Sequence, residues 1–441
     1  MFKTLKNAWK IEDIQNKILF TLLIILLYRI GCAIPVPFVD SSKLGNLAGV
    51  FSGTILEYLS LMSGGSLSQA TLFALSVSPY ITSSIVIQLL TVAFPDSLGK
   101  LAKEGEEGQK KIKKYTRWVT IGIALITAYG YTTLLASQYN LLNSDYIQWG
   151  TMWAKDLKGS LYTLVIIASY VAGACLIMWL AELIDAKGIG NGISMILFFN
   201  IVSSLPNYFV SLWSMIVSNP VLGIILAIVS VVLTLGMVLL IVWVTHSERR
   251  IPIQYAKRVV GRKMYGGQGT HLPIKLNMTG VMPVIFASSI VAVPGTIAAF
   301  LEKGAVKDFL NNWFGATSWL YVVLYIGLII AFAYFYVLIS FNPLEVANNI
   351  KNNGGAVPGI RAGKPTADYI TKILNRITLI GAFFLIVVAG LPLILNIVSG
   401  GTFAGIAFAG TSMLIVIGVA IETFRDIEAQ ITMRNYKGFL D

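Results

Sequence analysis

Residues 246–275 read HSERRIPIQYAKRVVGRKMYGGQGTHLPIK, and this basic stretch lies between two almost uninterrupted apolar runs at 221–244 and 278–301. The stretch holds seven Lys or Arg residues and one acid, Glu248. Charged side chains at this density need water, whereas apolar runs of about 20 residues fit the hydrocarbon of a bilayer as helices. The pattern predicts a membrane protein with a long polar loop between two spans, on the side where positive charge is retained.

The composition supports an integral membrane protein. Hydrophobic residues make up 56% of the 441 residues, charged residues 12%, and the mean hydropathy is +0.75. One soluble core could not bury that much apolar surface. The amphipathic start of the chain shows no cleavage site, so we expect the N-terminus to stay in the cytoplasm. Cys32 and Cys175 fall inside apolar runs, where a thiol favours packing over a disulfide.

Apolar runs of membrane-spanning length predict ten spans. The first five cover 18–34, 72–93, 118–136, 161–181 and 193–206, and the second five cover 221–244, 278–301, 319–340, 373–395 and 403–421. The fifth run is short and is preceded by glycines. An odd number of crossings separates equivalent helices of the two sets, so the two halves are inverted, an arrangement that commonly places a pathway between them.

Charge assigns a side to each loop. With these spans, 27 of the 33 Lys and Arg residues lie on one face and five on the other, with Arg29 inside the first span. The positive-inside rule makes the basic face cytoplasmic. Because the number of spans is even, both termini are expected on that face.

The spans hold few groups that could do chemistry or couple ions. Arg29 lies near the outer end of its span, where it can snorkel or cap, and Glu182 and Glu422 sit at helix ends. His246 and His271 have no cysteine or carboxylate cluster at ligand spacing. We therefore expect no metal, no cofactor and no enzymatic activity.

Two segments favour a pathway of another kind, each with an alternative. Ile81 and Ile85 lie on one helix face, either as an ordinary packing stripe or as part of an apolar constriction. The segment FSGTILEYLSLMSGGSLSQAT at 51–71 is too short to span, so it is either an external loop or a re-entrant piece shielded by protein.

Eight strings in order along the chain resemble the bacterial SecY family, the main subunit of a protein-conducting channel. They are RIGCAIPVP at 29–37, LMSGGSLSQATLFALSVSPYITSSIVIQLL at 61–90, KEGEEGQKKIKKYTR at 103–117, GIGNGIS at 188–194, ERRIPIQYAKR at 248–258, THLPIKLNMTGVMPVIFASSI at 270–290, FNPLEVANNIKNNGGAVPGIRAG at 341–363 and GTSMLIVIGVAIET at 410–423. They run from the first span to the last, so the resemblance covers essentially the whole chain.

The resemblance implies an all-α membrane protein. Its ten transmembrane helices form two pseudo-symmetric, inverted five-helix halves, a clamshell around a central hourglass pore. The N-terminal half is 1–206 with a plug at about 53–70, and the C-terminal half is 207–424 with cytoplasmic loops at 246–275 and 341–372. Residues 425–441 form a cytoplasmic tail.

The resemblance also assigns roles to residues. It places in the pore ring Ile81, Ile85, Leu197, Ile201, Ile285 and Ile415. It places in the plug Tyr58, Leu59, Leu61, Met62, Gly64, Gly65 and Leu67. Candidates for the lateral gate are Gln88 and Asn277. Candidates for docking SecA or the ribosome are Arg249, Arg250, Lys257, Arg258 and Arg361.

The implied function is passage of unfolded secretory polypeptides across the bacterial cytoplasmic membrane and lateral release of transmembrane helices into lipid. The implied partners are SecE, SecG, the motor ATPase SecA, ribosomal RNA and proteins, signal sequences, nascent chains and membrane lipids. Any one docking charge could instead be a topology anchor, although a functional contact is the better interpretation of Arg361, between Gly359 and Gly363. A secondary transporter with inverted repeats remains the main alternative function.

Overall fold

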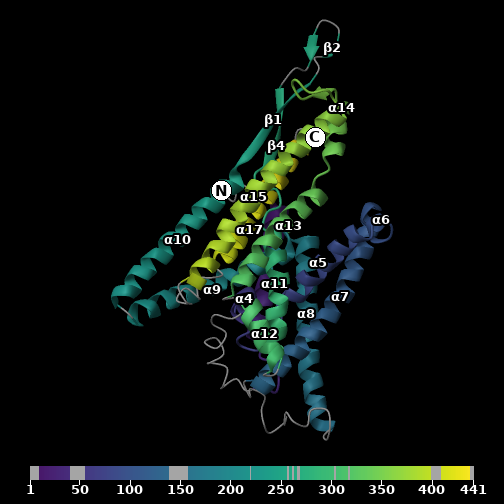
Figure 1. The fold of residues 1–441 in the computed structure, drawn as a ribbon. Helices are drawn as coiled ribbons and strands as arrows, with labels where there is room; N and C mark the ends of the chain where they lie inside the picture. Colours follow the sequence, from purple (N-terminus) through teal and green to yellow (C-terminus); the bar gives the residue numbers. More distant parts are fainter. Residues whose placement is uncertain are drawn as a thin grey trace.

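The computed structural model describes residues 9–39, 55–138, 157–218, 220–255, 258–260, 263–265, 269–301, 304–315, 318–398 and 409–437. Helices dominate it (Figure 1). Up to residue 218 they are α2 (Glu12–Ala33), α4 (Ile55–Met62), α5 (Ser78–Ala93), α6 (Leu98–Lys103), α7 (Glu106–Thr133), α8 (Leu157–Lys187) and α9 (Gly192–Ser218). The later helices are α10 (Pro220–His246), α11 (Met282–Phe300), α12 (Ala305–Phe314), α13 (Trp319–Ser340), α14 (Pro343–Asn352), α15 (Lys364–Val398) and α17 (Ala409–Lys437).

Each of the ten predicted spans overlaps a helix within the described residues, and α13 has the predicted bounds, whereas residues 403–408 of the last predicted span lie outside the described residues. Within the described residues, seven helices are long and apolar enough to cross a membrane, and α5 and α11 are apolar but shorter. Large apolar side chains on these helices face outward; Leu239 on α10 is 71% exposed and Leu338 on α13 is 77% exposed. Such a surface needs hydrocarbon as its solvent, so the structure is that of a multi-span membrane protein.

Most of the other helices differ in extent from the predicted spans, and two of these differences have a clear physical reason. Helix α9 continues through Pro206 to Ser218, although proline in a helix interior removes one backbone hydrogen bond. Membrane helices tolerate such a residue when neighbouring groups satisfy the backbone. The boundary predicted at residues 206 and 207 thus lies inside a helix, and the division into halves stays a prediction. Helix α5 begins at Ser78 rather than at 72, with Pro79 in its first turn.

The basic stretch at 246–275 is a β-hairpin arm, so the prediction of an all-α protein was wrong at this point. Strand β1 (Glu248–Tyr255) pairs antiparallel with β4 (Gly269–Lys275) and with the short β5 (Gly355–Ala356). Strands β2 (Arg258–Val260) and β3 (Lys263–Tyr265) pair with each other nearer the tip of the arm (Figure 1). Apolar residues recur at every second position along β1, which is the pattern of a strand, but the many charged residues of the stretch made this pattern hard to recognise in the sequence.

The arm joins two polar loops that the sequence analysis treated as separate. Ile251 and Ile253 alternate with exposed residues along β1 and are buried. They belong to one apolar core together with Ile350 of α14 and with Ile370 and Leu374 of α15. Because β1 also pairs with β5, the arm, α14 and the N-terminal part of α15 form one packed unit, predicted to be cytoplasmic and called here the cytoplasmic unit.

Candidate functional site

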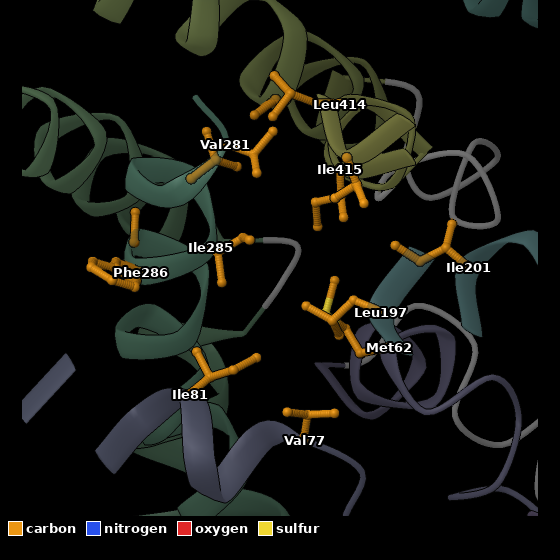
Figure 2. Close-up of a cluster of buried hydrophobic side chains, with 14 of the residues drawn as sticks. Met62, Val77, Ile81, Leu197, Ile201, Val281, Ile285, Phe286, Leu414 and Ile415 are labelled. Carbon is orange, nitrogen blue, oxygen red and sulfur yellow. The ribbon is translucent and has the colours of Figure 1, made fainter. Parts of the chain in front are cut away.

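Aliphatic side chains from four helices meet in the interior of the protein. The six predicted ring residues are all buried and belong to one apolar cluster: Ile81 and Ile85 on α5, Leu197 and Ile201 on α9, Ile285 on α11 and Ile415 on α17. Figure 2 labels five of them, whose side chains point toward a common centre between the helices. The structure therefore brings together residues as far apart in sequence as 81 and 415, as a constriction requires.

Other side chains of the same cluster were missed by the sequence analysis. Val77, Val281 and Leu414 are buried beside the predicted ring residues (Figure 2). Val77 and Val281 each precede a ring isoleucine, Ile81 or Ile285, by four residues, so they lie one turn away on the same helix face. That spacing was the signal that could have identified them.

The composition of this cluster determines its physical behaviour. The six predicted ring residues have hydrocarbon side chains that offer no partner to water or to an ion, so the desolvation cost of an unpaired polar species among them is not compensated. Aliphatic contacts are also non-directional, and each atom pair contributes only a few tenths of a kcal/mol or less. Such a group can seal when closed and part around a chain of any sequence.

The short helix α4 brings its last residue into this interior. Met62 is buried in the cluster, and Leu59 and Leu61 pack against it. This supports the re-entrant interpretation of the segment over the external loop. Leu67 is buried in a neighbouring cluster, and Gly64 and Gly65 take positive φ angles of 64° and 87° in the turn that ends the helix. The side chain of Tyr58 and residues 53 and 54 lie outside the described part of the plug segment.

An apolar cavity of about 330 Å³ lies between α4, α5, α7 and α11. Leu59 of α4, Ile81 of α5, Ile126 of α7 and Ile297 of α11 are among its lining residues. Ile126 is 73% exposed and Ile297 is 49% exposed, so the cavity reaches from the buried cluster toward the outer, lipid-facing surface. The cavity provides apolar space between α5 and α7 on one side and α11 on the other.

The seam between α5 and α11 is the predicted lateral gate. The two helices contact each other, and a hydrogen bond of 2.5 Å between the Ser83 and Thr120 hydroxyls fastens α5 to α7. Gln88 lies on α5 and donates to Ser84 on its own helix at 3.4 Å. Asn277 precedes α11, accepts from Thr279, and borders a small gap against α13 and α15. The structure thus places the two predicted gate residues on opposite sides of the seam without a hydrogen bond between them.

Exposed arginines lie on the packed unit formed by the arm, α14 and the N-terminal part of α15, which is predicted to be cytoplasmic. Arg249 and Arg250 are exposed, and Arg250 Nε donates to the Glu248 carboxylate at 2.7 Å. Arg361 is exposed in a turn between Gly359 and Gly363, whose φ angles are 79° and 98°. Of the remaining predicted docking residues, Lys257 and the side chain of Arg258 lie outside the described residues.

Charged groups also gather where the arm meets α17. Arg425 donates to the Thr245 carbonyl at the C-terminal end of α10, at 3.1 Å. Partial burial and the nearby Asp426 raise the pKa of Glu422, and partial burial and the nearby Arg425 lower the pKa of Lys275. The C-terminal end of α10, from which the arm continues, therefore contacts α17, the helix that carries Ile415.

Among the described residues, no group of three or more His, Cys, Asp or Glu side chains could hold a metal ion. Cys32 and Cys175 are both free. The chemistry available at the described centre is the parting and closing of apolar contacts.

Solved structures with this arrangement are membrane channels. The chain superimposes with a TM-score of 0.64 on the structure titled "The structure of a protein conducting channel", at 18% identity, covering 94% of this chain and 92% of the other. The TM-score is 0.63, at 17% identity and the same coverage, for a structure whose title states that the plug domain of the SecY protein stabilises the closed state. It is 0.61, at 16% identity, for Sec61 in the canine ribosome–channel complex. The fold is that of the protein-conducting membrane channels.

Sequence comparison gives the family. A model of the SecY family matches residues 71–424. The protein translocase subunits SecY of Streptomyces galbus and of Mycobacterium tuberculosis are each 41% identical to this chain, over 100% of both sequences. The chain belongs to the SecY family.

Proposed function

We propose that this chain is the channel subunit of a protein translocase, which passes unfolded secretory polypeptides across the bacterial cytoplasmic membrane. The observation that carries the proposal is the burial of six aliphatic residues from four helices in one apolar cluster, which also includes Met62 of the re-entrant helix α4. In this proposal the ten predicted spans form two inverted halves around an hourglass pore. The six aliphatic residues form its ring and α4 forms its plug. The excess of basic residues on one face supports cytoplasmic termini.

The seam between α5 and α11 is the proposed exit for hydrophobic helices. The cavity beside it is lined by apolar residues of α5, α7 and α11 and borders lipid-facing side chains. An apolar helix that moves from the pore into lipid gains roughly 25 cal/mol per Å² of apolar surface removed from water. This partition recognises hydrophobicity without reading a sequence, which suits a channel with many substrates.

The proposed partners bind at different parts of the channel. SecA and the ribosome dock on the cytoplasmic unit, where exposed arginines suit acidic protein surfaces and ribosomal RNA phosphates. SecE and SecG contact the lipid-facing helices, and signal sequences enter at the seam. A secondary transporter with inverted repeats is the weaker proposal, because it calls for ionisable coupling groups inside the membrane, which the predicted spans largely lack.

Reconstitution tests the function. We expect proteoliposomes containing this chain with SecE and SecG to protect a secretory precursor from external protease when SecA and ATP are supplied. Omission of ATP and vesicles without the chain are the controls. Accumulation of a small solute against its gradient, with no precursor protected, would favour the transporter and contradict the proposal.

A charge substitution tests the docking surface. We expect Arg361→Glu to lower SecA-driven precursor translocation about tenfold or more, because it replaces an exposed charge-assisted hydrogen-bond donor with a repelling carboxylate. Lys351→Glu is the matched control, since it reverses another exposed charge, on α14 of the same unit. An equal loss in both variants would show that only the net charge of the face matters, whereas no loss for Arg361→Glu would exclude the contact.

A further inference from the structure

The C-terminal end of the plug helix α4 is held by polar side chains from other parts of the chain. Asn200 on α9 donates from Nδ2 to the Met62 carbonyl at 2.9 Å and to the Tyr28 hydroxyl of α2 at 2.8 Å. Ser76, just before α5, donates to the same Met62 carbonyl at 3.2 Å. Two donors from distant segments therefore converge on the carbonyl of the last residue of α4.

These contacts lie in the buried interior, where a hydrogen bond is electrostatically stronger than in water. Asn200 and Tyr28 are 0% exposed and Ser76 is 3% exposed. The last carbonyls of a helix have no partner within it, so Asn200 and Ser76 supply what the end of α4 lacks. If α4 moved away, the Met62 carbonyl would lose both of its donors in a low-dielectric environment, which is costly, whereas the Asn200 amide would keep its bond to Tyr28. Such bonds are also directional, so they hold α4 in one position, as apolar contacts cannot.

The turn after α4 fits closely into the same polar site. Gly64 has a φ of 64°, and a Cβ added there would lie 2.9 Å from Arg29 Nη1 and 3.1 Å from both Asn200 Oδ1 and Ser203 Oγ. Arg29 Nη2 itself donates to the Phe199 carbonyl on α9. The intramembrane arginine thus packs beside the turn, which gives it a partner that the sequence analysis did not identify.

One atom of the site is unsatisfied. Asn200 Oδ1 is buried and accepts no hydrogen bond. A buried orphan acceptor offsets part of the gain from the two Nδ2 bonds.

We infer that Asn200, with Ser76, Tyr28 and Arg29, is a polar latch that holds the plug helix closed and so sets how strong a signal sequence must be to open the channel. The latch ties α4 to α2, α9 and the segment before α5, all in the predicted N-terminal half. Asn200 acts here as a positioning residue, because it touches the plug rather than the translocating chain. The inference rests on the proposed channel function.

The test removes the latch donors without removing bulk. We expect Asn200→Leu, reconstituted with SecE and SecG, to raise the ion conductance of the resting channel about tenfold or more. We expect a similar gain in translocation of a precursor with a defective signal sequence, because two buried donor bonds are lost. The control is Ser204→Ala, which deletes a buried hydroxyl of α9 that donates only to the Asn200 carbonyl on its own helix.

A second variant covers the case in which Asn200→Leu fails to fold. Ser76→Ala removes one bond to the same carbonyl, so we expect a smaller gain, about threefold, with a thermal midpoint close to that of the wild type. The two substitutions are expected to be non-additive where both can be combined, because they act on one acceptor. A purely structural role would lower the midpoint without raising conductance or relaxing signal selection.

The outcomes separate the latch from the channel function. Wild-type translocation with unchanged conductance and selectivity in both variants would overturn the latch and leave the channel proposal standing. If the wild type protects no precursor, the channel proposal fails, and the conductance of the variants still decides whether these residues close a pore.

Discussion

Replacing Ile415 with asparagine is expected to make the resting channel leak ions and to let it accept precursors with defective signal sequences. Ile415 lies on α17 and is 0% exposed. It belongs to the same buried cluster as Leu197, Ile201 and Ile285 (Figure 2). An amide at this position meets hydrocarbon on every side. Its unmet hydrogen bonds cost about 1–3 kcal/mol, in addition to the lost isoleucine burial. This cost destabilises the closed state relative to the open state.

The effect can be measured as single-channel conductance in planar bilayers and as protease-protected precursor with a charge placed in the signal core. We expect both to rise about tenfold or more, since 1.4 kcal/mol corresponds to a factor of ten. Ile415→Leu is the control, because it keeps the volume and the hydrocarbon and is expected to cost less than about 1.5 kcal/mol. Wild-type conductance and selection in Ile415→Asn would mean that Ile415 only packs α17 against its neighbours.

Gly173→Ala is expected to destabilise the protein strongly even though alanine is the better helix former. A Cβ at Gly173 on α8 would lie 2.1 Å from the Leu72 carbonyl oxygen and 3.0 Å from its carbon. The obstructing atoms belong to the backbone of the segment that leads into α5, so no side-chain rotation can relieve the clash. Overpacking of this kind costs about 3 kcal/mol or more when the backbone itself must shift.

The measurement is the thermal midpoint of the purified complex in detergent, together with the yield of monodisperse protein. Gly122→Ala on α7 is the matched control, because a Cβ there meets nothing within 4 Å. Alanine favours a helix over glycine by up to about 1 kcal/mol, so Gly122→Ala is expected to be neutral or stabilising. Equal midpoints for the two variants would show that α8 and the segment at Leu72 are not in tight contact in the folded protein.

The helices were predictable because their cause is local. Each predicted apolar run overlaps a helix in the described residues, and for α13 both ends match, since Ser318 caps the N-terminus and a polar segment follows Ser340. The six ring residues came from the resemblance rather than from periodicity, which alone could not separate a packing stripe from a constriction at Ile81 and Ile85. Their gathering in one buried cluster is consistent with the predicted ring, whose role in the pore stays a prediction.

Other features had no local signal. Strand β1 is a strand because β4 and β5 pair with it, and β5 lies about a hundred residues further along the chain. Asn200 is one polar residue in an apolar run, and nothing near it in sequence indicates that it reaches the Met62 carbonyl. Gln88 and Asn277 were assigned to one seam, but the structure gives each its own local partner instead.

The sequence by itself determined that this is a multi-span membrane protein with one strongly basic face and an interior almost free of ionisable groups, because hydropathy and charge act residue by residue against the bilayer. Only the tertiary structure decided which aliphatic residues meet, how the loops predicted at 246–275 and 341–372 form one packed unit, and which side chains contact the end of α4. Those features depend on contacts between segments far apart in the chain, and the packing geometry that selects such contacts is not written in any one segment.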